Sequence, residues 1–175
     1  MKRVYSIALL AAVLIGTAFP STAALSGNRS AHISGKPLVY AQARSVKVYL
    51  VAVGDEGKLG RKIGCGDSLV AVTRQIKATS APLRAALQEL LSIPREYAGD
   101  SRLNNFWVGN NLRLGSVSIR AGTATIQITG EGPSVAGVCD QPRITSQIEA
   151  TARQFPTVKR VRVFVNGRRL ADAIR

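Results

Sequence analysis

The segment Ala150–Leu170, with the sequence ATARQFPTVKRVRVFVNGRRL, constrains the fold of this chain most strongly. Apolar residues recur at three- and four-residue spacing from Ile144 to Phe155, which predicts a helix with one apolar stripe. Pro156 cannot continue that helix because it lacks a backbone N–H. Residues 160–165 then alternate valine with arginine or phenylalanine, which is typical of a strand with one buried face, and the following Asn-Gly pair favours a two-residue hairpin turn. A helix that leads directly into a strand needs a sheet to pack on.

The rest of the chain supplies the other strands of that sheet. The β-branched segments 46–53 and 69–76 predict two strands, and the leucines of residues 83–91 predict a helix that begins near Pro82 and ends before Pro94. The alternating segments around Ala121-Gly122 predict a hairpin. We therefore expect a single α+β domain over residues 45–175, with one mostly antiparallel sheet of about five strands and two helices packed on one face.

The N-terminus indicates export. Lys2 and Arg3 precede an apolar run that ends at Pro20, and small residues follow it. This layout is typical of a secretory signal peptide, which we assign to residues 1–24, with a retained membrane anchor as the alternative. Residues 25–44 are small and polar and are interpreted as a flexible linker. The predicted location is exported: periplasmic, extracellular or associated with the cell envelope.

The formal net charge of +14 indicates an acidic partner. Because an exported protein meets no genome, nucleic acid is not expected as that partner. We expect another envelope protein, an anionic envelope polymer or a lipid surface, and self-association through sheet edges stays open.

The two cysteines, Cys65 and Cys139, lie in separate glycine-rich loops. An even number of cysteines in an exported chain predicts a disulfide. Closing a loop of about 75 residues would stabilise the fold by roughly 4 kcal/mol in the chain-entropy model.

The string Gly-Asp-Ser-Leu that ends at Leu69 matches the GDSL motif of a group of serine esterases, with Ser68 as the nucleophile. Such a serine needs a histidine as general base, and the one histidine, His32, lies upstream in the predicted linker. No carboxylate spacing predicts an acid–base pair or a metal site, and no glycine-rich loop has a phosphate-binding pattern. We therefore expect a non-catalytic protein without metal or cofactor, with a GDSL-type hydrolase as the alternative.

Two surfaces are candidates for binding. The arginines near the C-terminus either keep an exposed sheet edge unpaired or form a strip that recognises anions. An aromatic pair in the polar loop 95–111 either covers the core or contacts a partner. The candidate residues are Arg160, Arg162, Arg168 and Arg169 for the strip and Phe106 and Trp107 for the aromatic contact.

Three segments of the chain resemble the GerMN domain of bacterial sporulation and spore-germination proteins. They are Val46–Leu50 (VKVYL), Ala86–Pro94 (ALQELLSIP) and Gln147–Gly167. Within the third segment the best match is Thr151–Val158 (TARQFPTV), followed by Val161, Val163 and Gly167. The likeness covers about residues 45 to 170. It implies an exported, non-enzymatic module of the bacterial envelope that takes part in protein assembly.

Overall fold

The computed structural model describes residues 44–174. The predicted signal peptide and all of the predicted linker except Arg44 lie outside the described residues. None of the helices within residues 44–174 has the length and hydrophobicity of a membrane-spanning segment.

The first sheet, sheet A, is built around a long antiparallel pair. β1 (Arg44–Ala52) pairs with β3 (Ser68–Ile76) along its whole length. The two-residue strands β2 (Arg61–Lys62) and β4 (Leu103–Asn104) extend the sheet in the order β2-β3-β1-β4. Because β4 pairs with only Val51 and Ala52, most of the β1 edge has no strand beside it among the described residues.

The second sheet, sheet B, has the order β5-β6-β7-β8. β5 (Arg113–Arg120) and β6 (Thr123–Thr129) form the predicted hairpin, whose turn residues Ala121 and Gly122 have φ angles of 45° and 73°. β7 (Arg160–Val165) lies parallel to β6, and the Asn-Gly turn at 166–167 leads into the short β8 (Arg168–Arg169). The β6–β7 pairing is the one parallel pairing among the described strands.

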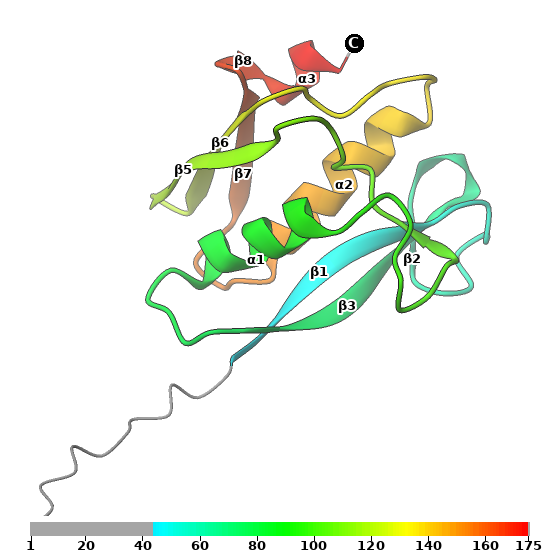
Figure 1. Cartoon of the computed structure of the whole chain (residues 1–175), viewed down its shortest axis with the longest axis horizontal. Helices are drawn as coiled ribbons and strands as arrows, with labels where there is room; N and C mark the ends of the chain where they lie inside the picture. The colour runs from blue at the N-terminus through cyan, green and yellow to red at the C-terminus, as the bar shows by residue number, and fades with distance from the viewer. Residues whose placement is uncertain (1–43, 175) are drawn as a thin grey trace, which may run out of the picture. The chain divides into compact units, whose positions relative to one another are not determined.

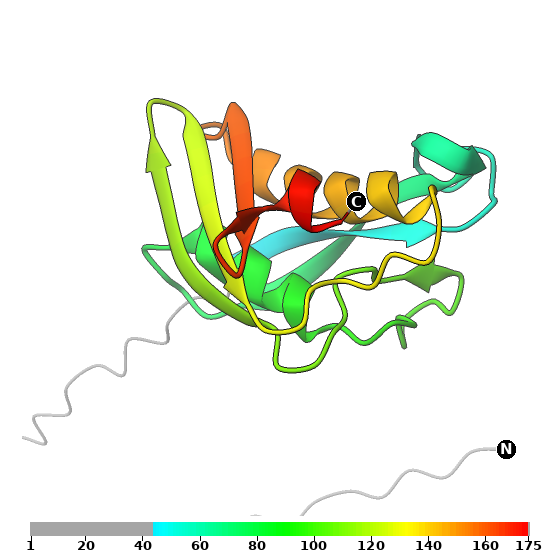
Figure 2. The same cartoon turned by 90° about the horizontal axis from the view of Figure 1, so that it is seen from above.

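Two helices lie between the sheets (Figures 1 and 2). α1 (Pro82–Ser92) and α2 (Asp140–Arg153) both contact β1 of sheet A, and on their other side α1 contacts β5 and α2 contacts β7. A 3-10 turn over Gly64–Gly66 and the short α3 (Leu170–Ala173) complete the fold. The α+β class is confirmed, whereas the prediction of one sheet with both helices on one face is wrong.

The reason for this difference lies in α2. Its apolar stripe, Ile144, Ile148 and Ala152, is buried as predicted, but Gln147 and Thr151 are fully buried as well. A helix between two sheets buries more than one stripe, and here part of the additional buried surface is polar. Hydrophobic periodicity detects only the apolar part, so the sequence pattern indicated a single covered face.

Candidate functional site

The pairing of sheet B gathers arginines from three strands on one face. Arg120 of β5 lies opposite Thr123 of β6, which lies opposite Arg160 of β7, and Arg160 Nε donates to Thr123 Oγ1 at 3.2 Å. The alternate residues of these strands, among them Ala124 and Val163, are buried against the helices. The arginines therefore lie on the sheet face that points away from the helices.

We call this surface the arginine face and define it by the exposed cations that the register places there. Arg162 lies beside Thr125, Arg169 lies opposite Phe164, and Arg113 lies opposite Thr129 at the far end of β5. The arginine face consists of Arg113, Arg120, Arg160, Arg162 and Arg169, all of which are exposed.

The structure thus brings together three of the four arginines predicted from the sequence. Arg168 is separated from them because it lies opposite Val165, whose side chain is buried. The Arg168 guanidinium donates to the main-chain oxygen of Asp172 at 2.9 Å instead. Sequence reasoning missed Arg120, because its place in line with Thr123 and Arg160 depends on the parallel pairing of β6 with β7.

The arginine face has an excess of positive charge. Six salt bridges join side chains within residues 44–174, and none of them includes an arginine of this face. Hydroxyl and amide side chains lie between the guanidinium groups, from Thr123, Thr125 and Gln127. Guanidinium groups are well suited to carboxylates and phosphates because their N–H groups can bind two oxygens at once.

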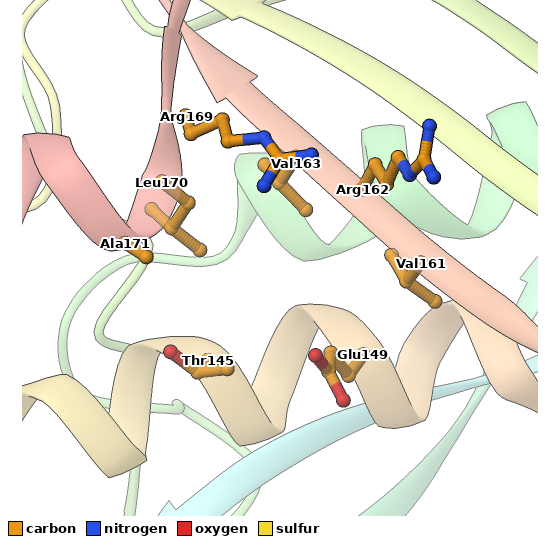
Figure 3. Close-up of a pocket in the computed structure, with 8 residues that line it drawn as sticks. All are labelled: Thr145, Glu149, Val161, Arg162, Val163, Arg169, Leu170 and Ala171. Carbon is orange, nitrogen blue, oxygen red and sulfur yellow. The ribbon is translucent and has the colours of Figure 1, made fainter.

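A groove runs beside the arginine face, along the edge of β7 (Figure 3). It encloses about 260 Å³, and Val161 points across it towards α2 while Arg162 points away from the helix. The groove is lined by Val161, Arg162 and Val163 of β7, Thr145 and Glu149 of α2, and Arg169, Leu170 and Ala171.

The edge of β1, on the other side of α2, is closed by side chains of that helix and of Gln154, the residue that follows it. Gln154 binds both main-chain groups of Lys47, accepting from its N–H at 2.8 Å and donating to its oxygen at 2.6 Å. The Thr151 hydroxyl accepts from the N–H of Tyr49 at 3.2 Å, and Gln147 donates to the oxygen of Tyr49 at 2.9 Å. These three side chains take the place of a neighbouring strand.

Comparison with known proteins assigns this chain to a family. Residues 47–171 match the family model Germane, described as sporulation and spore germination. The chain belongs to the Germane family. A search of curated proteins finds no match to this chain.

Two solved structures from Bacillus subtilis have a fold similar to this Germane domain. The tandem GerMN domains of the sporulation protein GerM are 21% identical with a TM-score of 0.52, over 72% of this chain and 40% of that chain. The first GerMN domain of GerM is 17% identical with a TM-score of 0.52, over 73% of this chain and 86% of that chain. This chain therefore spans less than half of the tandem structure.

The aromatic pair of the Germane domain lies in its core, so the interpretation as a partner contact is wrong. Trp107 is fully buried and donates its Nε1–H to the oxygen of Ile144 at 2.8 Å, and Phe106 is 2% exposed. The guanidinium groups of Arg95 and Arg143 lie 3.9 and 5.1 Å from the centre of the Phe106 ring. The loop 95–111 folds inward because these two large side chains fill space beside α2.

Cys65 and Cys139 form the predicted disulfide, with their Cα atoms 5.8 Å apart. The bond ties the loop after β1 to the residue that precedes α2. Beside it, Arg143 of α2 pairs with the buried Asp67 and, at 3.1 Å, with Asp140. Burial acts to raise the pKa of Asp140, but hydrogen bonds from the N–H groups of residues 136 and 137 and from Arg143 outweigh it, so this pKa lies below its ordinary value.

The environment of Ser68 does not support hydrolase chemistry. The Ser68 side chain is fully buried, so its hydroxyl is not accessible to a substrate. A nucleophile needs both access to substrate and a base within hydrogen-bond reach. His32, the only histidine, lies outside the described residues. Residues 44–174 also hold no cluster of three or more potential metal ligands.

Proposed function

We propose that this Germane domain is a non-catalytic binding module of the bacterial envelope whose arginine face holds an anionic envelope component. One observation carries the proposal: five exposed arginines from β5, β7 and β8 share a face on which no salt bridge within residues 44–174 neutralises them. The similar GerMN domains belong to a sporulation protein, and the N-terminal segment has the layout of an export signal. Both features support a role in envelope assembly.

The physical argument for binding rests on several charges acting together. A single exposed ion pair contributes about 0–1 kcal/mol, so one arginine gives little affinity. Several guanidinium groups on one sheet can bind a polyanion together, because the first contact holds the other groups close to the remaining anions. Such binding weakens as salt rises, because exposed charges are screened over about 10 Å at 0.1 M ionic strength.

The proposal is tested by fractionating cells that produce a quadruple variant with serine at positions 120, 160, 162 and 169. We expect this variant to lose retention on the envelope fraction while its unfolding midpoint stays unchanged. A control variant removes the same number of positive charges elsewhere, with serine in place of four exposed cations: Arg44, Lys58, Arg61 and Lys77.

The control variant should be retained like the unmodified protein. Equal retention of both variants would refute a role for the arginine face. Equal loss in both would mean that net charge matters and its position does not, which also contradicts the proposal.

A further inference from the structure

The main chain of β7 is directed alternately to its two sides. The N–H of Arg160 donates to the oxygen of Gly122, and that of Asn166 donates to the oxygen of Ile128, both at 2.9 Å. Even-numbered residues of β7 therefore face β6. Since neighbouring residues of a strand direct their main-chain groups to opposite sides, Val161 and Val163 direct theirs to the other edge.

That other edge is covered by a strand only in part. β8 pairs with β7 at Phe164 and Val165, and the chain then turns into α3 at Leu170. No described strand lies beside residues 160–163 on this side. Those four residues extend over about 13 Å, at about 3.3 Å for each residue of a strand. The groove of Figure 3 lies along them.

We propose that the groove accepts an extended segment of another protein, which adds to β7 as a further strand and carries acidic residues at alternate positions. The idea rests on the proposed function and names the class of its partner. Side chains of the added strand would alternate between the two sides of sheet B. On the outer side they would meet Arg162 and Arg169, which favours carboxylates.

On the inner side the added strand would meet a different environment. Val161 and Val163 project into the groove together with Leu170, and this favours small apolar side chains. Glu149 also lies there and pairs with Arg153 at 3.1 Å, so an acidic side chain on this side would be repelled. The groove therefore selects a segment in which acidic and small apolar residues alternate.

A second copy of this chain is a poor occupant of the same edge. Pairing of β7 with β7 would place Arg160 and Arg162 opposite or diagonal to the same arginines of the other copy. Like charges that face each other across neighbouring strands are destabilising. Charge complementarity thus favours an acidic segment over self-association.

The test uses the whole chain, purified, and the capped synthetic peptide Glu-Val-Glu-Val-Glu. We expect the peptide to bind, with slower amide hydrogen exchange at Val161 and Val163, and the same peptide with lysine in place of glutamate to bind about tenfold or more weakly. Two further peptides carry N-methyl groups either on the glutamates or on the valines. Because only one edge of the added strand faces β7, one methylated peptide should lose about tenfold in affinity and the other should bind like the parent.

A variant of the protein tests the same hydrogen bonds by changing β7 and not the peptide. Val161→Pro removes an N–H that points away from β6, so proline there leaves the β6–β7 pairing intact. It should weaken peptide binding about tenfold, whereas Val161→Ala, which keeps the N–H, should weaken it less. The methylated peptides keep the test decisive if Val161→Pro does not fold.

Three outcomes would overturn strand addition, and each leaves the proposed function separately testable. Equal affinity of both methylated peptides and the parent would mean that only side-chain charges bind. Failure of the parent peptide to bind, while the quadruple arginine variant still loses envelope retention, would place the anionic partner on the arginine face but outside the groove. Binding that appears only together with association of the protein itself would identify a second copy as the occupant.

Discussion

α2 lies beside two strand edges, those of β1 and β7. The two edges differ in whether side chains near α2 bind their main-chain groups. At β1 the main chain of Lys47 and Tyr49 is bound by Gln147 and Thr151 of α2 and by Gln154, which directly follows the helix. At β7 the same helix presents Thr145 and Glu149 across a groove, and arginines border the strand. One edge is closed by hydrogen bonds, whereas the other is left accessible and charged.

This difference indicates that the β1 edge contributes to the stability of the fold, whereas the β7 edge is available for binding. Unpaired main-chain groups at a sheet edge must be satisfied or protected, and a buried edge can be satisfied only from within the protein. The β1 edge lies partly in the core, so Gln147 and Thr151 contribute to folding. On its edge away from β6, β7 has no described strand beside residues 160–163, and charges limit which strands can approach there. Substitutions at the two edges should therefore have different kinds of effect.

The largest effect is expected for the disulfide, which fixes the start of α2 and so the position of both edges. Replacing Cys65 and Cys139 together by alanine should lower the free energy of unfolding by roughly 4 kcal/mol, because the bond closes a loop with a sequence separation of 74 residues. Urea unfolding with and without reductant measures the loss. Reductant should not affect the double variant, and an unchanged midpoint on reduction of the unmodified protein would contradict the prediction.

The next effect concerns Gln147 at the closed edge. Gln147→Met keeps a similar volume but leaves the N–H of Phe106, which donates to Gln147 Oε1 at 2.8 Å, and the oxygen of Tyr49 without this partner. Since Gln147 is fully buried, the loss should be roughly 2–4 kcal/mol.

The same substitution at the exposed Gln88 of α1 provides the control. Gln88→Met should change the unfolding midpoint in urea very little, since substitutions of exposed residues usually stay within about 0.5 kcal/mol. Similar midpoints for the two variants would show that the β1 edge does not depend on Gln147.

The features that could be predicted from the sequence are those determined by residues close together in the chain, together with the disulfide. The turn at Asn166-Gly167 could be predicted because both residues tolerate positive φ, and their φ angles are 49° and 80°. The turn at Ala121-Gly122 was predicted from the alternation of the segments on either side, and its φ angles are 45° and 73°. The helices, the hairpin and the disulfide follow from periodicity and cysteine count. Such patterns say that an element has a buried face, but not which strand it will pair with.

What the sequence could not predict depends on pairing between distant segments. The hydrogen bond from Arg160 to Thr123 joins residues 37 positions apart, and it is this register that adds Arg120 to the arginine face. The closure of β1 depends on Thr151 and Gln154, 102 and 107 positions from their partners. Both residues belong to the segment that resembles GerMN domains, yet as polar residues they add nothing to the apolar stripe.

Two threonines of α2 offer a direct comparison of the edges. Thr151→Val removes the oxygen that accepts from the N–H of Tyr49 and should cost about 1 kcal/mol, with faster hydrogen exchange at that amide. Thr145→Val alters the side of α2 that lines the groove and should change stability by less than about 0.5 kcal/mol. Unfolding in urea and amide exchange measure both. Equal losses would remove the distinction between the two edges.

The smallest effect on stability is expected at the open edge. Replacing Arg162 and Arg169 by serine should leave the free energy of unfolding within about 0.5 kcal/mol, because both side chains are exposed and neither takes part in a salt bridge within residues 44–174.

The same double variant should nevertheless associate as its concentration rises. Charged side chains on an edge strand oppose pairing with another copy, and without them the main-chain groups of Val161 and Val163 can bind a second β7. Sedimentation velocity over a range of concentrations measures this, with Arg61→Ser in β2 and Lys77→Ser directly after β3 as the matched double variant. A clear loss of stability would make these arginines structural. A double variant that stays monomeric like its control would mean that something other than charge keeps copies of the chain apart at β7.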